Sequence, residues 1–170
     1  MTLVELTVTL VVLVVAISGT LGSISSFVVL SDGNWERSVA YTAAQETIER
    51  MQSESFSDVF ARYNGDAADD PGPGAPGANF DVDGLDAQEG DPDGRVGRIE
   101  LPVQAGAPTS LFENLADPDF GMPRDLNSDG VVDALDHAGD HDILPVRVVI
   151  EWRGHSGQRR VELSTVLRNG

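Results

Sequence analysis

Most of residues 1–30 are apolar, and Glu5 is the only charged side chain among them. A helix rises about 1.5 Å per residue, so this segment is long enough to cross the roughly 30 Å hydrocarbon core of a bilayer. The first residues carry an acidic side chain instead of basic ones, and no Ala-x-Ala-like cleavage site follows the apolar segment. Both features argue against a cleaved signal peptide. A carboxylate at a membrane edge is costly, so we expect Glu5 to be functional and to pair with an amine, that of Met1 or of a neighbouring chain.

The pattern becomes amphipathic after a polar break at residues 31–34. Apolar side chains then recur at near-helical spacing, which predicts a helix over about 31–55: Trp35, Val39, Ala43, Ile48, Met51 and Phe56. No proline occurs in residues 1–70, so one long helix could run to about residue 54, either bent or interrupted at Gly19 and Gly22. A further short helical turn is expected at 57–63.

The second half of the chain predicts loops followed by strands. Residues 65–95 are acidic and rich in glycine and proline, which indicates loops. A first strand is expected at 98–103, and alternation at 146–152 and 159–167, around Gly154 and Gly157, predicts a hairpin over about 146–167. Trp35 and Trp152 are expected in the core. A helix followed by antiparallel strands indicates an α+β fold, in which the amphipathic part of the helix covers the sheet. The chain therefore divides into an apolar helix at 1–30 and a globular domain at 31–170.

The composition favours cation binding and excludes several functions. Twenty-eight acidic residues against eleven basic ones give a net charge of −17, which disfavours direct binding to nucleic acid. There is no cysteine, so disulfides and thiolate metal sites are excluded. No hydrolase elbow, phosphate-binding loop or zinc-protease motif is present, and we do not expect an enzyme.

Residues 125–136 have the spacing of a calcium-binding loop. Oxygen-bearing side chains occupy positions 1, 3, 5, 9 and 12, and glycine occupies position 6, where the backbone turns sharply. We expect calcium to bind through Asp125, Asn127, Asp129, the Val131 carbonyl, Asp133 (directly or through water) and Asp136. Aspartate at the twelfth position resembles dockerin-type loops. The preceding residues are poor helix formers, so a loop without the paired helices of an EF-hand is expected.

Two other groups of polar residues have alternative interpretations. His137 and His141 would suit zinc if they lay on a helix, but their glycine-containing surroundings favour polar loop residues. An acidic run at 81–93 could hold a second cation or be a solvated loop.

The sequence Met1-Thr2-Leu3-Val4-Glu5-Leu6 before a long Val/Leu run resembles the mature amino terminus of type IV pilins and type II secretion pseudopilins. The resemblance implies a pilin-like fold, a numbering that begins at the end processed by prepilin peptidase, a methylated Met1 amine, and pairing of Glu5 with that amine in an adjacent subunit. Many members have a proline near position 22, whereas this chain has Gly19 and Gly22. A generic membrane anchor with a chance acid is the alternative.

The function implied by this resemblance is structural. The chain would be held in a bacterial inner membrane and then, with the pilus or secretion machinery, join a helical homo-oligomeric filament outside the cell or at its surface. The apolar helices would form the filament core, and calcium would stabilise the globular domain. The alternatives are a minor pseudopilin that primes or tips a secretion filament, and a membrane-anchored, calcium-dependent binding module. Roles in adhesion, motility, secretion and uptake all remain open.

Overall fold

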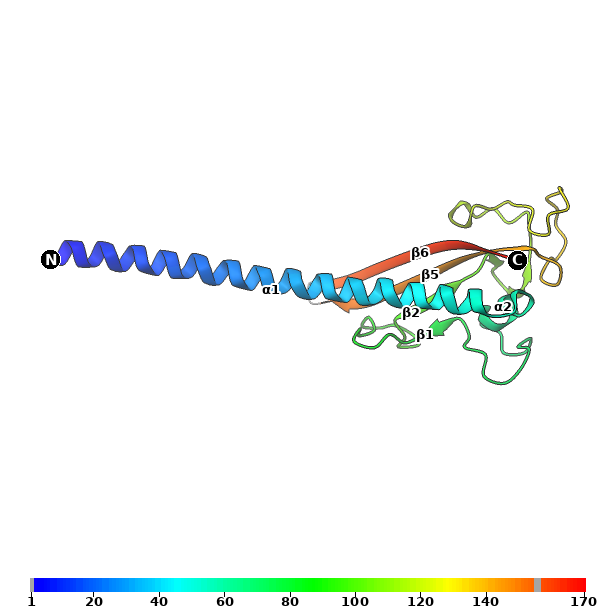
Figure 1. The fold of residues 1–170 in the computed structure, drawn as a ribbon, viewed down its shortest axis with the longest axis horizontal. Helices are drawn as coiled ribbons and strands as arrows, with labels where there is room; N and C mark the ends of the chain where they lie inside the picture. Colours follow the sequence, from blue (N-terminus) through cyan, green and yellow to red (C-terminus); the bar gives the residue numbers. More distant parts are fainter. Residues whose placement is uncertain (1, 155–156) are drawn as a thin grey trace.

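The computed structural model describes residues 2–154 and 157–170, apart from the side chains of residues 22, 24–26, 28 and 29. One long helix, α1 (Leu3–Ser53), extends far beyond an antiparallel sheet that packs along its carboxy-terminal half (Figure 1). A short helix, α2 (Phe56–Tyr63), follows at the end of α1. The α+β class with a long amino-terminal helix is confirmed.

A reciprocal cap begins α1. The Thr2 hydroxyl accepts a hydrogen bond from the Glu5 N–H at 3.3 Å, and the Glu5 carboxylate accepts one from the Thr2 N–H at 3.3 Å. This capping box supplies partners at a helix end that would otherwise lack them. The helix then continues for 51 residues, passing Gly19 and Gly22 without interruption in the single chain.

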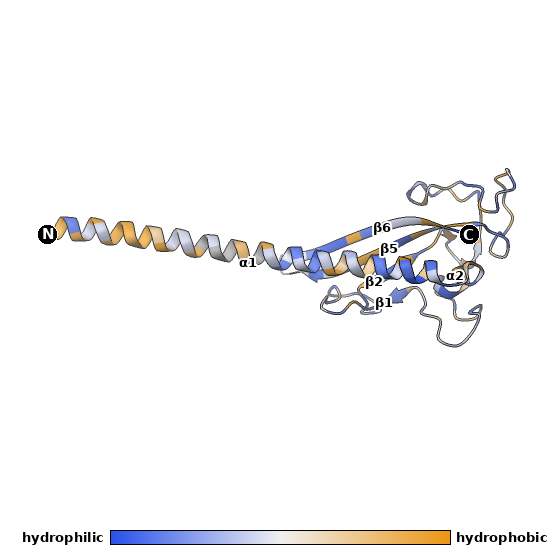
Figure 2. Cartoon of the chain, viewed as in Figure 1, coloured by the Kyte–Doolittle hydropathy of each residue, from blue (hydrophilic) through white to orange (hydrophobic). Residues whose placement is uncertain are grey.

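The two halves of α1 have different surroundings. Residues Leu3–Leu21 are apolar and entirely exposed, and by length and composition they could cross a membrane as an anchor or act as a signal sequence. Figure 2 shows this apolar half projecting away from the rest of the chain. In the second half Ala40, Ala44 and Met51 are buried against the sheet.

The sheet has the strand order β1-β2-β5-β6, with β1 at Asn79–Phe80 and β2 at Gly97–Glu100. Its largest part is the hairpin of β5 (Ile143–Gly154) and β6 (Gly157–Arg168), which contains the predicted 146–167 hairpin and is longer at both ends. The first predicted strand stops at Glu100, before Pro102, which has no N–H to donate. Two short strands that the sequence did not predict, β3 (Val103–Gln104) and β4 (Ala107–Leu111), form a separate ribbon, and a 3₁₀ turn, η1, follows at Pro118–Phe120.

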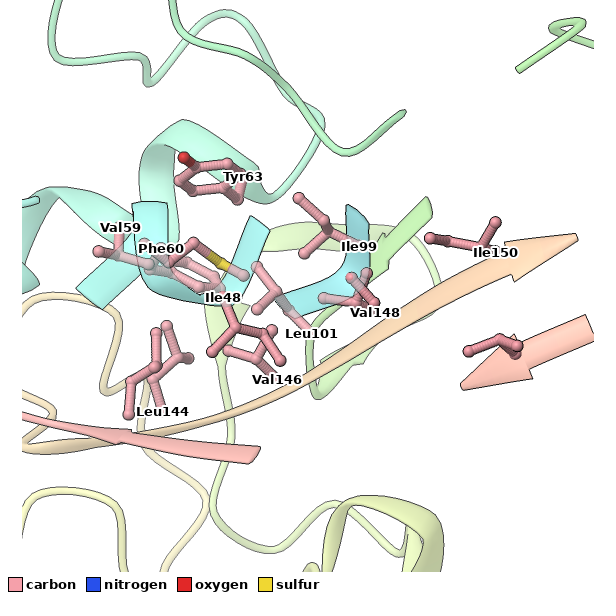
Figure 3. Packing of buried hydrophobic residues seen from close by; sticks show 14 of the residues in the cluster. Ile48, Val59, Phe60, Tyr63, Ile99, Leu101, Leu144, Val146, Val148 and Ile150 are labelled. Atoms are coloured by element: carbon pink, nitrogen blue, oxygen red, sulfur yellow. The ribbon is translucent and has the colours of Figure 1, made fainter. Parts of the chain in front are cut away.

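The core lies between one face of the sheet and the helices. Figure 3 shows Val146 and Val148 of β5 beside Leu101, Ile48 and Phe60. Trp152 is buried as predicted, and its indole N–H donates to the Glu36 carboxylate at 3.0 Å, which ties β5 to α1. The prediction that Trp35 lies in the core is wrong, because its side chain is 56% exposed. Its ring edge instead lies over Gly84, where an added Cβ would be 2.9 Å away.

Candidate metal centre

The loop of residues 125–136 lies between η1 and β5, at the end of the molecule farthest from the amino terminus (Figure 1). Neither flank is an α-helix, in agreement with the prediction of a loop without EF-hand helices. Two backbone bonds connect the loop to the start of β5, because the Leu126 carbonyl accepts from the N–H groups of Asp142 and Ile143 at 2.8 and 3.0 Å. The loop is therefore held against the hairpin.

The first half of the loop forms a tight series of side-chain turns. The Asp125 carboxylate accepts from the Gly130 N–H at 2.8 Å, the Asn127 side-chain oxygen from the Asp129 N–H at 3.2 Å, and the Asp129 carboxylate from the Val131 N–H at 2.8 Å. These bonds curl the backbone around side chains 1, 3 and 5 of the calcium pattern.

The tight curl requires left-handed backbone at two positions. Gly130, at loop position 6, has φ of 86°, which glycine adopts without steric cost. Ser128, at position 4, has φ of 63°, the only non-glycine residue with positive φ in the part of the chain that the structure describes.

One oxygen atom in the loop fits a bound cation. Asp125 Oδ1 is buried and has no hydrogen-bond partner among the described residues. A buried carboxylate oxygen without a donor is costly, and a cation would remove that cost. The donor set of carboxylate, amide and carbonyl oxygens is the chemistry that calcium prefers.

The second half of the loop makes other bonds. Asp136 Oδ1 accepts from the N–H groups of Leu111 and Ala138, both at 3.0 Å. Burial raises the pKa of Asp136. These two hydrogen bonds and one from the Ser110 hydroxyl lower it by a larger amount, so the net pKa is below the usual value. Asp133 Oδ1 accepts from the Leu135 N–H at 2.7 Å and faces His137 Nε2 at 3.2 Å.

The structure therefore gathers Asp125, Asn127 and Asp129 in one turn, and directs Asp133 and Asp136 to other partners. Bidentate binding by Asp136 would require its side chain to turn. Calcium binding through all six predicted residues of the loop therefore stays a prediction.

Glu113 is a site residue that sequence reasoning missed. Its side chain is 1% exposed, and Oε1 accepts from the N–H groups of Leu126 and Asn127 at 2.6 and 3.2 Å. The other oxygen, Oε2, accepts from the Asp133 N–H at 3.3 Å. One buried carboxylate thus connects both halves of the loop. No spacing in the sequence could reveal this, because Glu113 lies outside the loop pattern.

Both histidines lie in a loop, as expected, but both are buried. His137 is 4% exposed and His141 is 6% exposed. The His141 ring packs between Phe56 and Phe60, and its Nδ1–H donates to the His137 carbonyl at 3.1 Å. Burial lowers the pKa of His141. The segment that carries the two histidines is not helical, so they do not form a helical zinc pair.

His137 is surrounded by carboxylates. Its Nδ1 is 3.0 Å from Asp140 Oδ1, and its Nε2 is 3.2 Å from Asp133 Oδ1 and 3.9 Å from Glu113 Oε2. Burial lowers the pKa of His137, but its bonds with Asp133 and Asp140 and the charge of Glu113 outweigh burial, so the net pKa is raised.

Glu113, Asp133 and His137 place one ligand atom each within 4.8 Å of one another. This is the only such three-residue His, Asp and Glu group among the described residues, and the acidic run at 81–93 does not form one.

The two predicted assembly residues lie at the opposite end of the molecule. Glu5 is on the exposed apolar half of α1, and its carboxylate bonds with the Thr2 N–H. Met1 lies outside the described residues.

No protein-family model matches this sequence, and neither a curated protein nor a solved structure is significantly similar to it.

Proposed function

We propose that this protein is the structural subunit of a type IV pilus-like or type II secretion pseudopilus-like filament. The observation that carries the proposal is the division of α1 into an uncovered apolar half and a half packed on the sheet. An apolar helix that its own chain leaves bare needs another apolar environment. Lipid supplies it before assembly, and the apolar helices of neighbouring subunits supply it afterwards.

Glu5 gives the assembly its register. A carboxylate inside an apolar helix bundle is strongly unfavourable unless it is paired. Among the residues that the structure describes, its carboxylate accepts from the uncharged Thr2 N–H, at 3.3 Å. A positively charged amine of the next subunit would be a much stronger partner, so pairing favours one axial offset between neighbouring helices.

Small residues support close helix packing in the same half of α1. Ala16, Ser18, Gly19 and Ser23 lie within two turns, and an added Cβ at Gly19 meets nothing within 4 Å. The hydroxyls of Thr20 and Ser23 bond back to the Ala16 and Gly19 carbonyls at 2.8 and 3.1 Å, so they cost little in an apolar environment. Neighbouring helices can therefore approach closely here.

Glu5→Ala tests the proposal. We expect the variant to insert in the membrane normally but to be absent from filaments or strongly reduced there, as measured by electron microscopy and quantified against the membrane fraction. Thr9→Ala is a matched control in the same apolar half, because the Thr9 hydroxyl bonds only to the Glu5 carbonyl of its own helix. Normal filament yield from Glu5→Ala would contradict the proposal.

A membrane-anchored, calcium-dependent binding module is the second candidate, and one observation favours it. Three apolar side chains of the loop region, Val131, Val132 and Leu135, are exposed beside the candidate calcium site. Such a module would bind its partner while it stays a monomer or small oligomer. Long filaments of the purified protein would exclude it, whereas a filament that contains only a few copies at one end would favour the minor-pseudopilin alternative.

A further inference from the structure

We propose that Glu113, Asp133 and His137 form a second metal site, which shares Asp133 with the predicted calcium set but not Asp125, and that it binds a divalent transition cation of the zinc class. The three residues come from different places in the sequence, since Glu113 follows β4 and His137 follows the calcium loop. The fold brings them together by the bridge between Phe112 and Asp136.

The ligand distances suit a small cation. Zinc binds nitrogen and oxygen ligands at about 2.0–2.2 Å in a tetrahedral arrangement, which separates the ligand atoms by roughly 3.3 Å. His137 Nε2 is 3.2 Å from Asp133 Oδ1 and 3.9 Å from Glu113 Oε2. All three ligand atoms lie within 4.8 Å of one another, so the Asp133 edge already has the spacing of a small cation and the other ligand atoms would move inward when the metal binds.

The ligand types distinguish this cation from calcium. Calcium takes six to eight oxygen ligands and rarely an imidazole nitrogen. One imidazole with two carboxylates is typical of zinc, iron or manganese, with the remaining positions open to water. Within this group, zinc is the cation tested below, because it accepts both imidazole and carboxylate ligands in a small site.

The surroundings of His137 already have the arrangement found around a metal-bound histidine. The ring nitrogen that faces away from the metal usually donates its hydrogen to a carboxylate, which fixes the tautomer. Here Nδ1 lies 3.0 Å from Asp140 Oδ1, which leaves Nε2 directed to Glu113 and Asp133. Asp140 is a positioning residue in this site.

Burial and access are both suitable. The side chains of Glu113 and His137 are 1% and 5% exposed, whereas that of Asp133 is 33% exposed. A cation can therefore enter from the Asp133 side. Without a metal, a proton on Nε2 would fill the same space, and His137 would then be a buried cation among carboxylates.

The test uses the full-length protein in detergent, stripped of metal, and is repeated with saturating calcium because Asp133 also belongs to the predicted calcium set. Zinc is titrated by calorimetry, and cobalt is used as a visible probe of the coordination geometry. We expect one equivalent of zinc to bind, and cobalt to give the intense absorption of a tetrahedral site. His137→Gln and Asp133→Asn should each weaken zinc at least tenfold, and Asp140→Asn should weaken it about 10–100-fold.

Two features keep the result interpretable. Asp133 is the most exposed of the three ligands, so Asp133→Asn is the variant least prone to misfold, and circular dichroism checks each protein. Asp91→Asn removes the same charge far from the site and should bind zinc like the wild type. The proposal is overturned if micromolar zinc does not bind the metal-free wild type, or if binding persists unchanged in both ligand variants. Filament formation is not needed for either outcome.

Discussion

Many acidic side chains of this chain bond to its own backbone. Asp66, Asp91 and Asp93 each accept a hydrogen bond from the N–H two residues further along, and the first half of the calcium loop repeats that arrangement. Aspartate is favoured at such positions because its short carboxylate reaches its own turn. The net charge of −17 therefore partly reflects how the long loops are built.

Glu100 is an acid whose role is an ion pair. Its carboxylate accepts from Arg147 Nε at 2.7 Å and from Arg98 Nε at 2.8 Å. Burial raises the pKa of Glu100, but the bonds and charges of Arg98 and Arg147 outweigh burial, so the net pKa lies below the ordinary value of 4.5. The stabilisation is therefore present above pH 4.5 and is lost as the pH falls through the lower folded pKa.

We expect Glu100→Gln to lower the free energy of unfolding by about 1–3 kcal/mol near neutral pH. The difference from wild type should shrink as the pH falls below 4.5, which urea unfolding at several pH values would measure. Glu89→Gln is the control, because its pair with Arg153 is highly exposed and should contribute little. A difference that does not depend on pH would contradict the ion-pair explanation.

At the scale of elements, periodicity predicted α1 and the final hairpin because both are long and regular. The hairpin pattern also included glycines at the turn, and the apolar face of β5 alternates clearly. The β3–β4 ribbon was missed because strands of a few residues have no measurable period. Glu113 and the burial of the two histidines were missed for a different reason, since both depend on contacts between distant segments.

The close approach of β1 and β2 gives a prediction about packing. A Cβ at Gly97 would overlap the Phe80 ring, so Gly97→Ala should destabilise the domain by about 1–3 kcal/mol. Gly72→Ala is the control, because an added Cβ there meets nothing within 4 Å and its φ is not positive. Thermal unfolding of both variants is the measurement, and equal melting temperatures would contradict the prediction.

The helix α1 is continuous in the single chain, but we expect its segment around Gly19 and Gly22 to open most readily when helices pack in a filament. Gly19 and Gly22 each cost roughly 1 kcal/mol relative to alanine, so residues 15–26 are the weakest part of the helix. In the proposed filament we expect the amides of this segment to exchange hydrogen faster than those of residues 5–14, as measured by mass spectrometry. Gly19→Ala should slow that exchange, and uniform protection along both segments would contradict the prediction.

At the scale of the whole molecule, calcium binding at the loop should stabilise the globular domain. The Leu126 carbonyl connects the loop to β5, so a loose loop would weaken the start of the central hairpin. Calcium at a hundred times its dissociation constant contributes about 2.7 kcal/mol, which corresponds to a melting shift of roughly 5–10 °C for a domain of this size.

The full-length protein in detergent, with calcium and with chelator, provides the measurement. Chelation should lower the melting temperature of the wild type and increase protease cleavage within 121–142, whereas Asp129→Ala should be insensitive to both calcium and chelator. If chelation changes neither property of the wild type, the loop does not bind calcium in a structural role.

The direction of α1 relative to β6 determines how the molecule carries a mechanical load. The two elements pack together and run the same way, with the amino terminus at one end of the molecule and the carboxy terminus at the other (Figure 1). Tension between the termini therefore slides the helix along the sheet, and many side-chain contacts must yield at once. Tension between Ile143 and Arg168, which are paired at the open end of the hairpin, separates the strands one pair at a time. Single-molecule stretching should give the higher rupture force for the first geometry.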